Sequence, residues 1–229
     1  MPILEKEKHY TGNHDLGFMM FCSFGNAYRI TKNSNYKPTI DTAAASLITR
    51  YRPGAKVIQS WNSSKKWKGP VIIDNLMNLE LLLWVAANGG DDKYRKIAVE
   101  HADATMKNHF RKDYSSYHVV DYDMNTGKVL KKGTSQGAAD SSAWSRGQGW
   151  ALYGYTMMYR FTKNKQYLDF AKNIAKFILN NPAMPDDQVP YWDFNAPGIP
   201  NTYKDASAAA VIASAFLELG QYTQGKDRA

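Results

Sequence analysis

Side chains that could bind or transform a polar substrate stand at the start of four apolar segments of this sequence. They are His14 and Asp15, Asp74, Trp144 and Arg146, and Asp205. Carboxylates and imidazoles transfer protons, and a guanidinium binds anions. Indole rings offer flat apolar platforms with polar tips, which suit sugars. Because unrelated helix starts would not share such similar chemistry, we expect the four to open onto one site.

Asp74 is the strongest candidate for proton transfer. The apolar run 70–73 precedes it, and an apolar setting raises the pKa of a carboxyl, which can then donate a proton. Other candidate residues could instead have a purely structural role. Asp205 is also typical of a helix N-cap. His14 could be a satisfied polar group near the core, and His118 a surface residue of a hairpin.

The elements that must position these residues are helices in repeated pairs. The first helix of each pair is expected near 14–30, 73–90, 142–158 and 203–220, and it is apolar on more than one face. The second is amphipathic, with lysines on its outer side. This alternation of inner and outer helices predicts an all-α fold, an (α/α) toroid with about three and a half hairpins. A bundle of long helices is disfavoured by the long loops, of which 118–130 is expected to form a short β-hairpin.

Composition narrows the function further. The chain has 229 residues and no apolar run long enough to cross a bilayer. Its formal charge is +8, but the lysines are scattered, which argues against nucleic acid and leaves an acidic small substrate. Cys22 is the only cysteine, so neither an intramolecular disulfide nor a cysteine-rich metal site is possible. No pattern suggests a metal, a nucleotide or a flavin, and we expect no cofactor.

Three motifs together resemble the unsaturated glucuronyl hydrolases of glycoside hydrolase family 88. They are His14-Asp15-Leu16-Gly17-Phe18, Asp74-Asn75-Leu76-Met77-Asn78 and Trp144-Ser145-Arg146-Gly147-Gln148-Gly149-Trp150. Each motif alone is weak, but their order and spacing are fairly specific, and the resemblance extends from His14 to about Leu219. The Arg-Gly-Gln form favours this family over the related unsaturated rhamnogalacturonyl hydrolases.

The resemblance implies a reaction and two catalytic carboxylates. Such enzymes release the 4,5-unsaturated uronic acid that lyases leave at the non-reducing end of an oligosaccharide, by hydrating the vinyl ether of its ring. By family position, Asp74 is the general acid and base, and Asp15 is the second carboxylate. Matching positions imply substrate contacts from seven further residues. These are His14, Trp61, His118, Gln136, Trp144, Arg146 and Trp150.

The family toroid has six hairpins, so helices before His14 and after Tyr222 are expected to be missing. We therefore interpret residues 1–229 as a single α/α-toroid catalytic domain truncated at both ends, and expect this piece to be weakly active or inactive. The alternatives are an unsaturated rhamnogalacturonyl hydrolase and a non-catalytic glycan-binding toroid. The sequence predicts an oligosaccharide partner and neither nucleic acid nor membrane. It leaves open the glycan, the oligomeric state, and whether the bacterial cytoplasm or the periplasm is the location.

Overall fold

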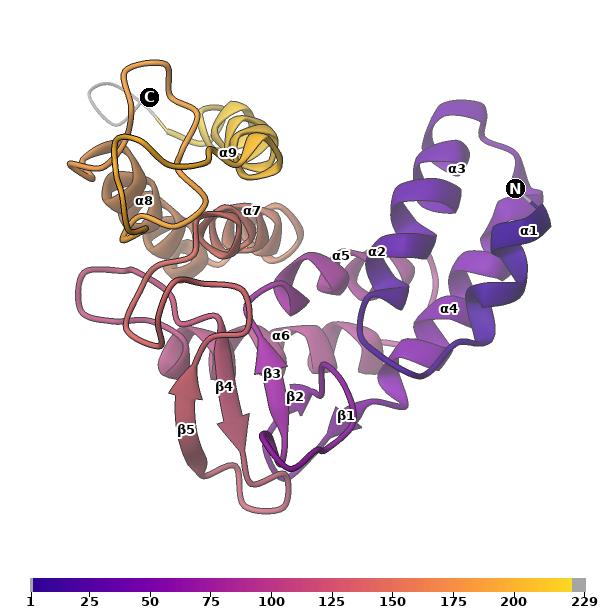
Figure 1. The fold of residues 1–229 in the computed structure, drawn as a ribbon. Coiled ribbons are helices and arrows are strands. Elements are labelled where there is room, and N and C mark those ends of the chain that lie inside the picture. The colour runs from indigo at the N-terminus through magenta and orange to yellow at the C-terminus, as the bar shows by residue number, and fades with distance from the viewer. Residues whose placement is uncertain (1, 224–229) are drawn as a thin grey trace. The chain divides into compact units, whose positions relative to one another are not determined.

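The computed structural model describes residues 2–223, which are mainly helical (Figure 1). The elements are α1 (Pro2–Glu5), η1 (Lys6–His9), α2 (Leu16–Met20), the π-helical turn η2 (Phe21–Gly25), α3 (Asn26–Thr31), η3 (Ser34–Tyr36), α4 (Lys37–Ile48), β1 (Tyr51–Arg52), β2 (Val57–Ile58), β3 (Pro70–Ile72), α5 (Asn75–Ala87), α6 (Lys93–Asn108), β4 (Val119–Tyr122), β5 (Val129–Gly133), α7 (Ser145–Thr162), α8 (Lys165–Leu179) and α9 (Ala206–Leu219). No helix among these residues is long and apolar enough to cross a membrane.

The chain divides into two compact units. The first holds the chain up to Ala104 together with Asp121–Leu130, and the second holds Thr105–Val120 and the chain from Lys131 onward. The chain passes between the units along α6 and along the hairpin of β4 and β5.

In the first unit, α2 packs against α4 and α5. Helix α5 is buried on every face, with Leu76, Leu79, Leu81, Leu82 and Leu83 fully enclosed, which confirms the prediction of an apolar inner helix. The predicted helix from His14 to Ile30 is interrupted by the π turn η2. The ring of Phe21 lies over Gly25 within that turn, where a Cβ would be 2.5 Å from the ring.

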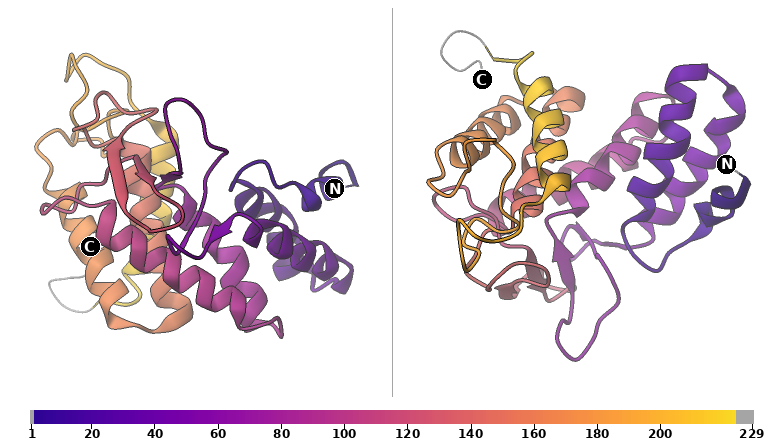
Figure 2. Two further views of the ribbon diagram at one scale, coloured as in Figure 1. Left: turned by 90° about the horizontal axis from the view of Figure 1, so that it is seen from below. Right: turned by 45° about the horizontal axis from the view of Figure 1, so that its top comes forward.

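In the second unit, α7 packs against α8 and α9, the orange and yellow helices of Figures 1 and 2. Helix α8 buries residues at helical spacing, including Tyr167, Ala171, Ile174 and Ile178, and exposes Lys176. This matches the amphipathic outer helix that the sequence predicted.

The turns after α3 and α7 are copies of one another. Lys32 and Lys163 end these helices in the left-handed region, at φ 57° and 56°. The next residue, Asn33 or Asn164, accepts a hydrogen bond at 3.0 Å from the N–H two residues on. The segments read YRITKN (28–33) and YRFTKN (159–164). This repeated turn is direct evidence for repeated helical hairpins.

The first turn of α2 lies directly against α5. A Cβ on Gly17 would be 2.8 Å from both Cβ and the carbonyl oxygen of Asn78. The N–H of Phe18 donates to Oδ1 of Asn78 at 2.6 Å. Glycine is therefore needed here for close approach of the two helices.

We expect Gly17→Ala to destabilise the protein, although alanine is the better helix former. The added methyl must push α2 from α5, and overpacking of this kind costs about 1–3 kcal/mol. Urea denaturation measures the loss. Ala45→Ser, on the exposed side of α4, is the control and should change stability by no more than about 0.5 kcal/mol. An unchanged midpoint for Gly17→Ala would show that the contact is not tight.

Candidate functional site

All four helix starts singled out in the sequence are helix starts in the structure. Asp15, Asp74, Trp144 and Asp205 occupy the N-cap positions of α2, α5, α7 and α9. The first two belong to the first unit and the last two to the second. The sequence therefore located the residues correctly with respect to secondary structure.

The two candidate carboxylates begin helices that touch at their first turns. Asp15 immediately precedes α2 and Asp74 immediately precedes α5, one turn before the Asn78 that contacts Gly17. Asp74 is 7% exposed, whereas the side chain of Asp15 is 49% exposed. One carboxyl is thus largely removed from water and the other is open to it. That asymmetry suits two carboxyls with different tasks.

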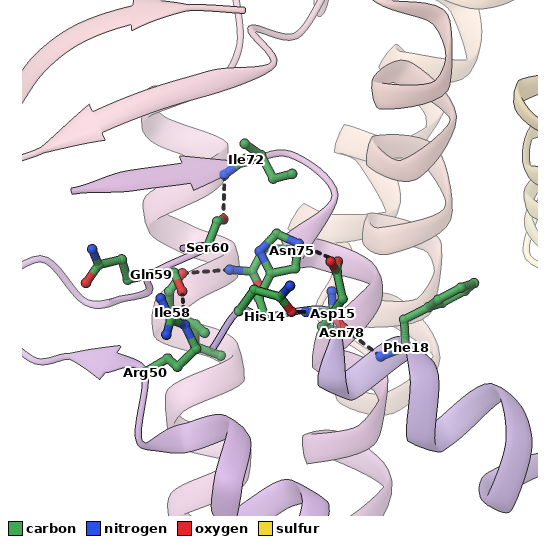
Figure 3. Close-up of polar contacts among 11 residues, drawn as sticks. His14, Asp15, Phe18, Arg50, Ile58, Gln59, Ser60, Ile72, Asn75 and Asn78 are labelled. Carbon is green, nitrogen blue, oxygen red and sulfur yellow. Dashed lines mark hydrogen bonds and ion pairs between the residues drawn. The ribbon is translucent and has the colours of Figure 1, made fainter. Parts of the chain in front are cut away.

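Ser60 connects the segments that lead to the two carboxylates (Figure 3). Its carbonyl oxygen accepts the N–H of His14 at 3.0 Å, and its hydroxyl oxygen accepts the N–H of Ile72 at 2.9 Å. Its own N–H donates to the carbonyl of Pro70 at 2.8 Å. Ser60 is fully buried, so these bonds fix the backbone just before Asp15 and just before Asp74. Sequence reasoning missed this residue, because a serine in a loop carries no distinctive pattern.

Buried polar side chains support the same region. Nδ2 of Asn75 donates to the carbonyl of Ile58 at 2.6 Å. Arg50 is 3% exposed, and its guanidinium donates to the carbonyls of Gln59 and Thr11 at 2.7 and 2.6 Å. These bonds join the strand β2 to α5 and to the chain ahead of α2. Arg50 was also missed, since nothing in its neighbours marks it as buried.

His14 lies behind Asp15. Its ring is buried, and its Nε2 is 3.0 Å from Oδ1 of Asp15. The hydrogen bond from this ring lowers the pKa of Asp15 below its ordinary value, while partial burial of the carboxyl opposes the shift. Asp15 is therefore ionised at neutral pH. Trp61 follows Ser60 in the same loop and is partly exposed.

In the second unit, the ring of Trp144 is at the centre of a cluster. The ring is 4% exposed and lies 4.6 Å from the ring of His118, centroid to centroid. The guanidinium carbon of Arg146 stands 4.9 Å from the centroid of the Trp144 ring. Arg146 also contacts Asp205, at 3.4 Å, and Gln136, whose Oε1 accepts at 3.3 Å. The structure thus brings together His118, Gln136, Trp144, Arg146 and Asp205.

Asp205 both caps helix α9 and contacts Arg146. Its Oδ1 accepts the N–H of Ala208 at 2.8 Å, which is the capping bond of α9. Its Oδ2 is the atom that faces Arg146. The capping interpretation is confirmed, and the contact with Arg146 places a negative charge beside the cationic side of the cluster.

His118 holds the loop that carries Gln136. Its Nδ1 accepts the backbone N–H groups of Ser135 and Gln136, both at 3.1 Å. Because Nδ1 is an acceptor, the proton of the neutral ring lies on Nε2. Trp150 lies further along α7 and packs edge-to-face on Tyr153, with centroids 6.2 Å apart.

Two buried residues that were not among the predicted site residues build the frame of this cluster. Asp193 is fully buried, and its Oδ2 accepts the N–H of Ala138 at 2.9 Å and the hydroxyl of Ser142 at 2.6 Å. Oε1 of Gln148 accepts the N–H of Ser116 at 2.9 Å. Gln148 is therefore a structural residue within the motif. Among residues 2–223, no group of three or more His, Cys, Asp or Glu side chains is arranged to hold a metal ion.

Comparison with known proteins shows to which protein family the chain belongs. A solved structure of an unsaturated glucuronyl hydrolase specific for heparin matches with a TM-score of 0.93 and 49% identity, over 96% of this chain and 59% of that one. Glucuronyl hydrolases are (α/α) toroids, so the likeness confirms the predicted fold class. Residues 4–218 match the model of Glycosyl Hydrolase Family 88, and the chain belongs to that family.

Two curated relatives support the same family assignment. The unsaturated glucuronyl hydrolase of Formosa agariphila is 47% identical over 226 residues, which are 98% of this chain and 56% of the relative. The unsaturated chondroitin disaccharide hydrolase of Streptococcus pyogenes serotype M1 is 35% identical over 90% of this chain and 52% of the relative. The chain thus spans about half the length of the curated relatives it matches.

The buried His101, on α6, makes stability depend on pH. Burial lowers the pKa of His101 to about 3, and the charge of His14 acts in the same direction. The unfolded side chain titrates near pH 6.5. Below that pH the unfolded chain binds a proton that the folded protein excludes, so stability falls as pH drops from about 6.5 towards about 3.

We expect His101→Asn to flatten this dependence. Nδ1 of His101 accepts the N–H of Ile58 at 2.9 Å, and the amide oxygen of asparagine can accept the same bond without titrating. Urea denaturation between about pH 7 and pH 4.5 measures the slope, which is at most about 1.4 kcal/mol per pH unit for one group. His9→Asn, on an exposed histidine, should leave the slope as it is. Equal slopes for wild type and His101→Asn would contradict the assignment.

Proposed function

We propose that this chain carries the catalytic face of a glycosidase that releases 4,5-unsaturated uronic acid from the non-reducing end of lyase-generated oligosaccharides. The observation that carries the proposal is the pair of carboxyls at the adjoining starts of α2 and α5, in a chain of glycosyl hydrolase family 88. The relatives' names support this substrate class.

The chemistry assigned to the two carboxyls is hydration of a vinyl ether. Asp74 in its acid form donates a proton to C4 of the unsaturated ring, and its carboxylate then accepts a proton from the water that adds at C5. The resulting hemiketal opens and expels the rest of the oligosaccharide. The nearly buried position of Asp74 limits the access of bulk water to this proton donor and acceptor. The ionised Asp15 stabilises the positive charge that develops on the ring.

The second unit supplies groups that suit an anionic sugar. Arg146 offers a guanidinium for a carboxylate or sulfate, and Gln136 and His118 offer polar contacts beside it. Trp61, Trp144 and Trp150 are the proposed apolar platforms. The relatives' names include heparin and chondroitin disaccharides, so a glycosaminoglycan fragment is the first substrate to test.

Asp74→Asn separates catalysis from binding. We expect kcat on an unsaturated disaccharide to fall by about 10²–10⁴-fold, because the proton donor is lost. The Kd measured by calorimetry should stay the same, since the amide keeps the shape of the carboxyl. Loss of the ultraviolet absorbance of the unsaturated ring measures turnover. Asp41→Asn, on the exposed side of α4, is the control and should retain full activity.

Other outcomes decide between the alternatives. Binding without turnover by a protein that spans the full length of the curated relatives would favour a glycan-binding toroid. Faster turnover of unsaturated galacturonyl-rhamnose than of glucuronyl-hexosamine would favour a rhamnogalacturonyl hydrolase. Turnover by Asp74→Asn at the wild-type rate would overturn the assignment of Asp74.

A further inference from the structure

The His14 ring and the Asp15 carboxylate are neighbours in sequence but differ sharply in exposure. The side chain of His14 is 2% exposed and that of Asp15 is 49% exposed, with 3.0 Å between Nε2 and Oδ1 (Figure 3). A buried ring behind an exposed carboxylate is poorly placed to meet a sugar. It is well placed to hold the carboxylate.

The backbone around the pair is held at each step. The N–H of His14 donates to the carbonyl of Ser60, and the N–H of Asp15 donates to Oδ1 of Asn13, both at 3.0 Å. The N–H of Gly17 donates to the carbonyl of His14 at 3.2 Å. These bonds fix the backbone of the pair, and the His14 ring is the group that contacts the Asp15 side chain.

His101 does not supply a positive charge to this region. Its Nδ1 accepts the N–H of Ile58, so the neutral ring carries its proton on Nε2. Burial keeps its pKa at about 3, and it stays neutral at working pH. Among the described residues, Nδ1 and Nε2 of His14 and Nε2 of His101 are buried and have no hydrogen-bond partner of good geometry. The 3.0 Å approach of Nε2 to Oδ1 of Asp15 is the polar contact that the structure gives the His14 ring.

We propose that His14 is a positioning residue, which holds the Asp15 carboxylate in one orientation through Nε2 and makes no contact with the sugar, in place of the substrate contact that its family position implied. The proposal rests on the proposed function for what Asp15 does in catalysis. Its structural part, control of Asp15 by the ring, stands apart from that function and is tested separately. The neighbouring titratable group that interacts with the pair is the buried His101 on α6, on which the charge of His14 acts.

Two variants test the proposal. His14→Ala removes the donor, and His14→Gln retains an amide N–H near the place of Nε2. We expect His14→Ala to lower kcat by about 10²-fold, the size of effect that follows a misplaced catalytic group, with little change in KM. We expect His14→Gln to recover much of that loss. In the pH profile of kcat/KM, the limb assigned to Asp15 should move to higher pH in His14→Ala, because a favourable hydrogen bond to the carboxylate is gone.

A measurement without turnover keeps this test independent of the proposed function. ¹³C NMR of labelled aspartate follows the titration of the Asp15 carboxyl, assigned with Asp15→Asn. We expect the titration to move to higher pH in His14→Ala and to lie between the two in His14→Gln. If this shift occurs but a protein that spans the full length of the relatives shows no turnover, the proposed function fails and the control of Asp15 by His14 stands.

The opposite results overturn the proposal. An unchanged Asp15 titration in a folded His14→Ala protein would remove the basis for positioning. A rise in KM at constant kcat, with an unchanged pH profile, would show that His14 contacts the sugar directly. Failure of His14→Ala to fold would leave His14→Gln to decide, by the same titration and the same division between kcat and KM.

Discussion

The close approach of α2 to α5 is the constraint on which the first unit depends. Gly17 has no side chain, and its place against Asn78 lets the two helix starts meet. The amide of Asn78 then accepts the N–H of Phe18, which would otherwise lack a partner in the first turn of α2. A buried contact between a glycine and an amide therefore determines where the two carboxyls stand, although neither residue is chemically reactive.

The surrounding polar groups extend this constraint. Ser60, Arg50 and Asn75 bind backbone atoms of segments that are distant in the sequence. Buried polar groups must be paired, and a network that satisfies them specifies one arrangement of the loops. In the second unit, other buried polar side chains hold the loops in the same way. Asp193 and Gln148 hold the loops around Trp144 and Arg146, and the candidate binding groups lie on that frame.

The sequence allowed the helical hairpins, the four helix starts and the fold class to be predicted, because each depends on local periodicity and on motifs in order. Asp15, Asp74, Trp144 and Asp205 directly precede helices, as the predicted helix starts required, and Asp205 makes the capping bond that the sequence suggested. The π turn at Phe21–Gly25 was not predicted, since apolar periodicity does not distinguish it from a continuous helix. The shared turn after α3 and α7 was visible in the sequence as YRITKN and YRFTKN, and a search for repeats would have found it.

The sequence by itself determined which residue types begin each helix, and therefore which chemistry is available. Burial and long-range hydrogen bonds were decided only by the tertiary structure. His14 and Asp15 are adjacent in the chain, yet one is enclosed and the other open, because the packing around α2 covers only one of the two side chains. Likewise, Ser60 gained its importance from Pro70 and Ile72, ten and twelve residues away. Solvent exposure and pairing depend on neighbours brought together by folding, and local sequence does not encode those neighbours.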